Sequence, residues 1–254
     1  MLLPKDRRFE SRWVILNGQK LHFIFAPKSE DVNSLPMVLV SGLGVSSSYM
    51  IPSALELSKD ADIYCPDLPG TGRSSKPSKT LNISELAESL FAFIEECKID
   101  RAVFISHSFG CQIAVEFALK YPQRLHSLVL AAPTGDPKIK SSLRYFGRLL
   151  LDVPREPFSL VPIAIKDYLK AGLLRGYQTL KFSLKDCFKE KLRLVKIPTL
   201  VICGLNDPIV SKEWVEEIVK LLPDRNLVCI KDAAHAVNYN SPRAFASVIR
   251  EFIY

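Results

Sequence analysis

Hydrophobic residues in this chain gather in short runs that alternate with longer amphipathic stretches. Short apolar, β-rich runs predict strands, and they occupy residues 13–16, 21–26, 37–40, 61–65, 102–106, 128–132, 199–204 and 226–230. The four runs between residues 37 and 132 are almost continuously apolar, which is typical of parallel strands buried on both faces. The alternation therefore predicts an α/β protein with a mostly parallel sheet covered by helices.

Three of the intervening stretches have clear helix-start signals. Asn82 and Glu85 have capping-box spacing at the start of a predicted helix over 82–97. Ser211 is the expected N-cap of the next helix. Ser241, followed by a proline, is the expected N-cap of the last one.

The alternation stops between residues 134 and 196. This segment lacks strand-like runs and predicts several short helices broken at Pro154, Pro157 and Pro162. Residues 1–133 and 197–254 are therefore expected to form one α/β core, and residues 134–196 a helical insertion. In such an architecture the insertion would lie over the carboxyl ends of the strands and wall a pocket.

Residues 103–112, VFISHSFGCQ, contain an unusual strand ending. An apolar strand runs into Ser108, and an apolar-faced helix follows at once. A tight strand-to-helix turn presents a serine hydroxyl at the carboxyl edge of the sheet. Gly110 is one small flank of this elbow, and Ser106 stands where a G-x-S-x-G motif has its first glycine. Ser108 is thus a candidate nucleophile, with a simple helix N-cap as the alternative.

Four further segments, together with this elbow, resemble the α/β-hydrolase family in the right order. They are SGLG (41–44), DLPGTGRSS (67–75), GLNDPIV (204–210) and AAHAVNYNSP (233–242). The resemblance covers nearly the whole chain and implies an α/β-hydrolase fold with an eight-stranded sheet and an inserted helical cap. It also implies a catalytic triad of Ser108, Asp207 and His235.

The resemblance assigns further roles around the triad. The backbone N–H groups of Leu43 and Phe109 are expected to form the oxyanion hole, and Gly42 and His107 to contribute to substrate binding. His107 should point away from Ser108, because neighbouring residues of an extended segment face opposite sides. Competing candidates are Asp136 for the acid, and His22 and His126 for the base. No cofactor or metal is expected.

The implied activity is hydrolysis of a carboxylic ester or related acyl bond through an acyl-enzyme. Carbon–carbon bond hydrolysis or thioester hydrolysis would use the same triad. A ligand-binding receptor or pseudoenzyme of this fold is the alternative from another class. The expected substrate is a small molecule with an apolar acyl or ring group. Apolar residues of the inserted segment either line its pocket or pack onto the core: Leu149, Leu150, Leu151, Phe158, Leu160, Val161, Ile163 and Ile165.

Charge is concentrated in the inserted segment. Residues 134–196 carry 14 Lys/Arg and 6 Asp/Glu, a net charge of +8, whereas the whole chain has +7. The excess indicates a solvated basic face, or attraction of an anionic substrate or an acidic membrane surface. Nucleic-acid binding is not expected, because no basic motif is interleaved with aromatic residues.

Two further patterns bear on location. The opening MLLPKDRRFESRW lacks the apolar stretch of a secretory signal, and no run approaches a membrane span, so a cytoplasmic protein without stable membrane insertion is expected. The six cysteines show no C-x-x-C pair and are expected to be free thiols.

Overall fold

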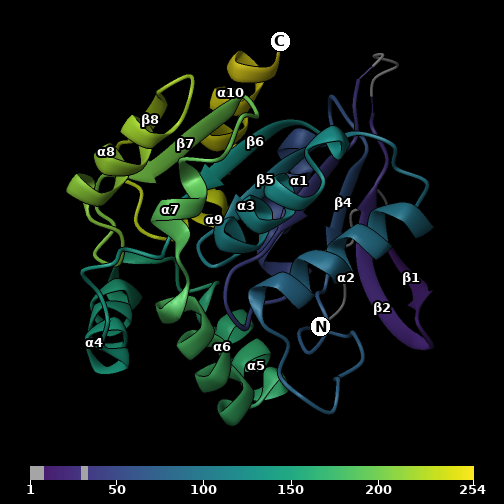
Figure 1. Ribbon diagram of the computed structural model, residues 1–254, viewed down its shortest axis with the longest axis horizontal. Coiled ribbons are helices and arrows are strands. Elements are labelled where there is room, and N and C mark those ends of the chain that lie inside the picture. The colour runs from purple at the N-terminus through teal and green to yellow at the C-terminus, as the bar shows by residue number, and fades with distance from the viewer. Residues whose placement is uncertain (1–8, 30–33) are drawn as a thin grey trace.

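The strands form one sheet in the order β1-β2-β4-β3-β5-β6-β7-β8. The computed structural model describes residues 9–29 and 34–254 (Figure 1). β2 is antiparallel to both β1 and β4, and the pairs that follow from β4 to β8 in this order are parallel. The strands are β1 Glu10–Leu16, β2 Gln19–Ala26, β3 Met37–Val40, β4 Ile63–Pro66, β5 Ala102–His107, β6 Leu125–Ala131, β7 Thr199–Gly204 and β8 Asn226–Ile230. The predicted eight-stranded, mostly parallel sheet is confirmed. Residues 1–8, on which the expectation of no secretory signal partly rests, lie outside the described residues.

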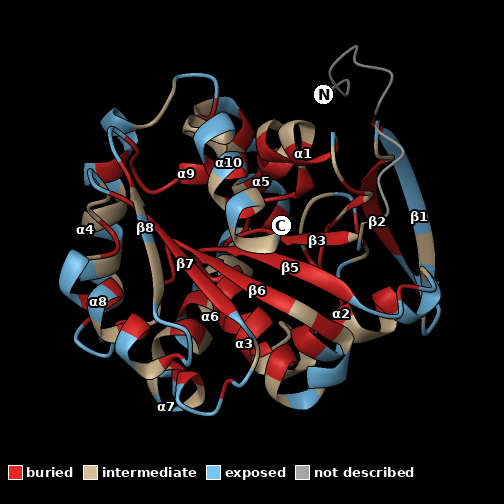
Figure 2. Cartoon of the chain, turned by 90° about the horizontal axis from the view of Figure 1, so that it is seen from above, coloured by how far each residue is buried: buried red, intermediate tan, exposed pale blue. Residues whose placement is uncertain are grey.

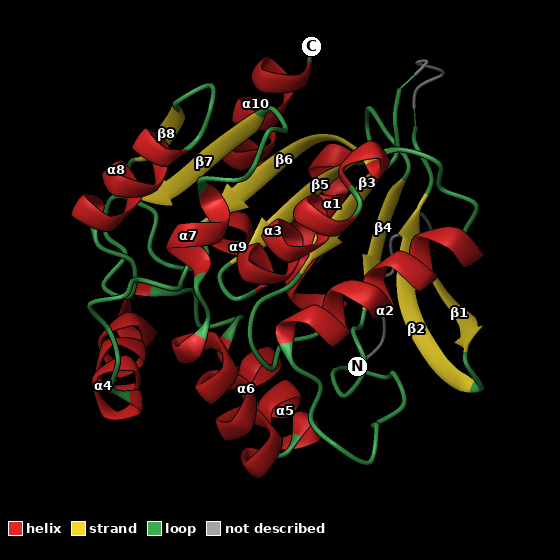
Figure 3. Ribbon diagram, viewed as in Figure 1, coloured by secondary structure: helices red, strands yellow, loops and turns green. Residues whose placement is uncertain are grey.

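Helices cover both faces of this sheet (Figure 3). Those of the core are α1 Ile51–Leu57, α2 Ile83–Glu96, α3 Gly110–Lys120, α8 Lys212–Leu221, α9 Val237–Asn240 and α10 Pro242–Ile253. Side chains of β5 point alternately to opposite faces, as the strand period requires. Ala102 and Phe104 pack into a core cluster with α2, α3 and α8, whereas Val103 and Ile105 pack with α1 and α10. Figure 2 shows the central strands buried between these two helical layers.

All three predicted N-cap residues stand at the start of a helix, and two of them make a side-chain cap hydrogen bond. Asn82 and Glu85 exchange side-chain and backbone hydrogen bonds, at 3.0 and 2.9 Å, as a capping box. The Ser211 hydroxyl accepts from the Trp214 N–H at 3.3 Å. Ser241 is the N-cap residue of α10, as predicted, but its side chain makes no cap hydrogen bond. Ser241 joins α9 directly to α10, and its ψ of 49° is not the extended conformation of a side-chain N-cap.

Residues 134–196, hereafter the cap segment, are helical. The helices are α4 Ser142–Asp152, the 3₁₀ turn η3 Val153–Arg155, α5 Val161–Ala171, α6 Leu173–Lys185 and α7 Phe188–Leu192. Pro162 lies in the first turn of α5, so it begins this helix instead of breaking one. Figure 1 shows α4, α5 and α6 on the side to which the arrowheads of β5, β6 and β7 point. α7 returns to the core, where Phe188 and Leu192 are fully buried beside α3 and α8.

Candidate active site

Ser108 lies in the turn between β5 and α3. Its φ of 55° is in the left-handed region, which non-glycine residues rarely adopt. Gly110 permits this turn: a Cβ at this position would lie 2.6 Å from the Val40 carbonyl oxygen. Ser106 replaces the first glycine of the motif without losing a hydrogen bond, because its hydroxyl donates to the Val129 carbonyl at 2.8 Å. The strand-to-helix elbow predicted at Ser108 is present.

Three predicted side chains meet at the carboxyl edge of the sheet. His235 Nε2 lies 2.9 Å from Ser108 Oγ, and His235 Nδ1 lies 2.8 Å from Asp207 Oδ2. All three side chains are buried. Because a carboxylate only accepts, Nδ1 carries the proton and Nε2 is free to accept from the Ser108 hydroxyl. The other Asp207 oxygen accepts from the N–H groups of Ile209 and Val210, at 2.7 and 3.0 Å.

The surroundings of His235 raise the pKa of its imidazole above the ordinary value. Burial alone lowers the pKa of His235, but the charge and hydrogen bond of Asp207, with the charges of Asp152 and Glu156, outweigh burial and raise that pKa. His235 can therefore take up a proton readily, as a general base must.

His107 faces the histidine loop and makes no hydrogen bond to Ser108. Its Nε2–H donates to the His235 carbonyl oxygen at 2.8 Å. Burial lowers the pKa of His107 to about 3, so this ring is neutral near pH 7. His107 also lines the cavity described below. The hydrogen bond to the backbone of residue 235 could not be read from the sequence, because 128 residues separate the two histidines.

The SGLG loop lies against the elbow. A Cβ on Gly42 would lie 3.2 Å from Ser108 Cβ, so the loop and the serine approach closely here. The Ser41 hydroxyl donates to the Val45 carbonyl at 3.1 Å and closes the loop on itself. The backbone N–H groups of Leu43 and Phe109 donate to no other residue in the described part of the chain. Both amides are thus available to an acceptor beside Ser108.

A cavity of about 290 Å³ opens beside Ser108 and His235. Its wall combines the SGLG loop with cap helices α4 and α5, and most of the lining is apolar: Leu43, Val45, Leu149, Val153, Leu160, Val161, Ala164 and Ile165. Tyr49, Tyr145 and Tyr168 add aromatic surface. Pockets of this size and composition commonly bind small organic molecules.

Two carboxylates of the cap segment also line this cavity, and sequence reasoning missed both. Asp152 accepts from the His235 N–H at 3.3 Å, and Glu156 accepts from the Ala236 N–H at 2.6 Å. Burial raises the pKa of Glu156 to about 7, although hydrogen bonds from Ala236 and Asn240 oppose that rise. The cavity lining contains no lysine or arginine among the described residues. No lysine or arginine of the described residues thus faces these two carboxyl groups across the cavity, despite the basic composition of the cap segment.

The apolar residues predicted for the cap segment divide into three groups. Leu149, Leu160, Val161 and Ile165 line the cavity. Ile163 is buried without lining it. Leu150, Leu151 and Phe158 neither line the cavity nor pack onto the core, because their side chains are exposed.

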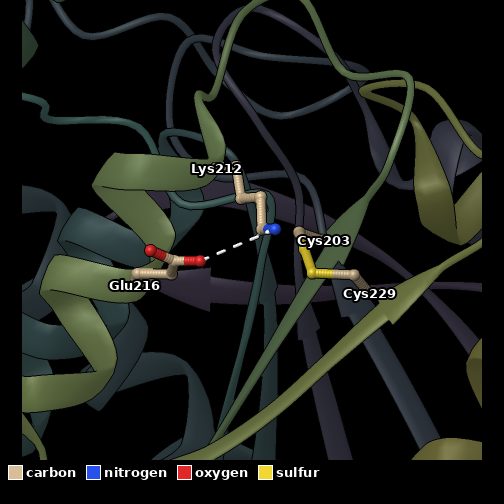
Figure 4. Close-up of a disulfide and its surroundings, with 4 residues drawn as sticks. All are labelled: Cys203, Lys212, Glu216 and Cys229. Atoms are coloured by element: carbon tan, nitrogen blue, oxygen red, sulfur yellow. Dashed lines mark ion pairs between the residues drawn. A yellow bond between two sulfur atoms is a disulfide. The ribbon is translucent and has the colours of Figure 1, made fainter.

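The expectation of free thiols is wrong for two cysteines. Cys203 and Cys229 form a disulfide (Figure 4). They are direct partners in the β7–β8 ladder, so strand register aligns two residues that lie 26 positions apart in the sequence. Cys203 precedes the Asp207 loop and Cys229 precedes the His235 loop. The free cysteines are Cys65, Cys97, Cys111 and Cys187.

The competing candidates lie away from this cavity. Asp136 accepts from the Lys138 N–H at 2.8 Å and has no hydrogen bond to His235. His126 lies in β6 near its start. His22 Nδ1 lies 2.8 Å from Asp67 Oδ2, and this carboxylate also accepts from the Ser47 and Arg73 N–H groups. The His22–Asp67 pair thereby anchors the DLPGTGRSS loop to β2.

In residues 9–29 and 34–254, no cluster of three or more His, Cys, Asp or Glu side chains is arranged to hold a metal ion. No helix within those ranges has the length and apolar character needed to cross a bilayer.

The chain is similar to known proteins in sequence and in fold. Residues 37–248 match the model of the alpha/beta hydrolase family. The "Putative carbamate hydrolase RutD" of Escherichia coli O139:H28 is 25% identical over 241 residues, covering 84% of this chain and 89% of that protein.

Two solved structures are similar over most of the chain. A bacterial membrane phospholipase A is 19% identical with a TM-score of 0.81, covering 97% of this chain and 86% of that one. Est816, an N-acyl homoserine lactone degrading enzyme, is 20% identical with a TM-score of 0.82, covering 95% of this chain and 100% of that one. At these identities the structural similarity establishes the fold alone.

Proposed function

Because the chain belongs to the alpha/beta hydrolase family, we propose that it is a serine hydrolase that cleaves a carboxylic ester or a related acyl bond. The observation that carries this proposal is the continuous hydrogen-bonded line from Ser108 through His235 to Asp207. A serine used only as a helix cap would not need a buried imidazole and carboxylate behind it.

The proposed mechanism assigns a role to each of these groups. His235 Nε2 takes the proton of Ser108 as Oγ attacks the substrate carbonyl carbon, and Asp207 stabilises the imidazolium that forms. The N–H groups of Leu43 and Phe109 receive the oxyanion, each contributing about 3 kcal/mol to the transition state. His235 then protonates the leaving group, and a water molecule activated by the same imidazole hydrolyses the acyl-enzyme.

The cavity suggests what kind of acyl group is bound. Its apolar lining supports an apolar chain or ring, and Asp152 and Glu156 in the wall disfavour an anionic group there. We therefore propose a neutral acyl group, with residues 134–196 acting as the cap that encloses it. Gly42 and His107 would form the part of the wall next to the reacting carbonyl.

The test is turnover of a substrate panel by wild type and Ser108→Ala in parallel. The panel contains p-nitrophenyl esters of increasing acyl length, matched thioesters, lactones, a carbamate and a vinylogous diketone. Wild type should release p-nitrophenol from the esters and be labelled by a fluorophosphonate, and Ser108→Ala should lose about 10⁴-fold or more in kcat.

Each of the other outcomes would indicate a different function for this protein. If only the diketone or only the thioesters are turned over, the activity is carbon–carbon bond hydrolysis or thioester hydrolysis and not ester hydrolysis. Ligand binding without turnover or labelling would indicate a receptor or pseudoenzyme. Equal rates in wild type and Ser108→Ala would refute the serine mechanism.

A further inference from the structure

The outer surface of the cap segment is unusually apolar. Six large apolar side chains are more than two thirds exposed among the described residues, and all six lie between residues 143 and 174: Leu143, Leu150, Phe158, Leu169, Leu173 and Leu174. Phe158 is 95% exposed. Exposing so many apolar side chains to water is unfavourable. A surface of this kind commonly marks an interaction site.

Cap helix α4 is apolar on two sides. On α4, Tyr145 and Leu149 line the cavity, whereas Leu143 and Leu150 are exposed. Residues seven apart lie on the same side of a helix. The outer apolar stripe is therefore separate from the inner one and is not explained by the substrate pocket.

The exposed charge on this surface has one sign. Residues 142–177 contain three acidic residues, Asp152, Glu156 and Asp167, and all three turn inward as hydrogen-bond acceptors. The exposed charged side chains of the same stretch are Arg144, Arg155, Lys166 and Lys170. An apolar face bordered by lysine and arginine is the pattern of helices that lie in the interface of an anionic membrane.

We propose that this outer face, formed by α4, α5 and the start of α6, docks onto an anionic lipid bilayer. A second copy of the chain would bring cations of the same sign together, so charge complementarity favours the bilayer. Apolar side chains would enter the headgroup region while the four cations contact lipid phosphates. No helix crosses the bilayer in this arrangement.

Docking would also place the cavity at the lipid surface. Val153 and Ile165 line the cavity and are 50% and 55% exposed, so they stand at its mouth within the same face. An amphiphilic ester could then pass from the bilayer to Ser108 without crossing water. This consequence depends on the proposed function, whereas docking itself does not.

The test is co-sedimentation of full-length Ser108→Ala protein with vesicles, which requires no turnover. Binding is expected to vesicles of phosphatidylcholine mixed with phosphatidylglycerol, to be weak on phosphatidylcholine alone, and to fall with added NaCl. Leu169→Ser with Leu173→Ser, and separately Lys166→Gln with Lys170→Gln, should each lower the partition coefficient by about tenfold or more.

Matched variants elsewhere on the surface are the controls. Ile15→Ser with Leu194→Ser removes two apolar side chains that are each 63% exposed, and Lys76→Gln with Lys231→Gln removes two exposed cations. Both controls should bind vesicles like the parent. Absence of binding, equal binding to both vesicle types, or equal loss in test and control variants overturns the proposal. Self-association that Leu169→Ser with Leu173→Ser abolishes, without vesicle binding, would instead show an interface between copies.

Discussion

Ser108 and Gly110 illustrate how single residues maintain the elbow. Ser108 has a backbone conformation that costs free energy, and the close approach of the elbow to the β3 end holds it there. Gly110 makes that approach possible, because its missing side chain leaves room for the carbonyl oxygens of Val40 and Ser41. The reactive position is thus produced by the space available at its neighbour.

Gly110→Ala tests this steric argument. A Cβ at this position would contact two backbone oxygens at 2.6 and 2.7 Å, so the free energy of unfolding should fall by about 1–3 kcal/mol. Urea unfolding measures the change. Gly176→Ala is the control: nothing lies within 4 Å of its Cβ position in α6, so it should stabilise by up to about 1 kcal/mol. Unchanged stability in Gly110→Ala would contradict the argument.

Asp152 should affect the pH dependence of activity. The base must be neutral, and the raised pKa of His235 places the acidic limb of kcat/KM above its ordinary value of 6.5. Asp152→Asn removes one of the negative charges that raise this pKa. The acidic limb should therefore move to lower pH, by on the order of one unit or less.

The pH–rate profile of an ester substrate measures this shift. Asp167→Asn is a matched control, because Asp167 is also a buried cap carboxylate but bonds to Ser46 instead of the histidine loop. A profile that moves equally in both variants, or toward higher pH in Asp152→Asn, would show that the charge of residue 152 does not act on His235.

At the scale of elements, β7 and β8 carry Asp207 and His235, the proposed acid and base, on the loops that follow them. The disulfide joins these two neighbouring strands just before both loops begin, close to α8, as Figure 4 shows. It thereby restrains the relative position of the two strands on which Asp207 and His235 depend.

Removing this cross-link should lower stability measurably. Closure of a loop of this length predicts a loss of about 3–4 kcal/mol in Cys203→Ser with Cys229→Ser. Thermal unfolding measures the loss, with Cys187→Ser, an exposed free thiol, as a control that should leave Tm unchanged. Thiol titration under denaturing conditions should find four thiols before reduction and six after it. Six thiols without reductant would show that the bond is absent.

At the scale of the whole molecule, the cavity exists only because the cap segment and the core meet. Leu43 and Ser108 of the core face Leu149 and Ala164 of the cap across the same space. Two hydrogen bonds, from the N–H groups of His235 and Ala236 to the cap carboxylates, tie the cap to the histidine loop. The cap wall of the cavity and the position of His235 are therefore coupled.

Ala164→Trp should shorten the acyl chain that the cavity accepts. Each buried methylene contributes about 0.8 kcal/mol, so wild-type kcat/KM should rise about fourfold per methylene until the cavity is full. The tryptophan fills this space, so the rise should end at a shorter chain while the acetyl ester is little affected. Leu194→Trp, at an exposed position away from the cavity, is the control. An unchanged chain-length profile would place the acyl group elsewhere.

Much of the architecture was predictable because its signals are local. Apolar runs indicated all eight strands, and Asn82 and Ser211 indicated two helix starts, since burial of both sheet faces and capping each leave a pattern within a few residues. Ser241 also indicated a helix start, but its missing side-chain cap bond was not predictable, because its geometry depends on the short helix before it.

The sequence by itself determined the strand–helix alternation, the elbow and the residues with the right chemistry, because each depends on neighbours along the chain. Only the tertiary structure decided that Ser108 and His235, 127 residues apart, lie within a hydrogen bond. It also decided that Asp152 faces inward while Leu150 faces out, and that Cys203 meets Cys229. These outcomes depend on strand register and on how the cap helices are rotated against the core, and no local pattern records either.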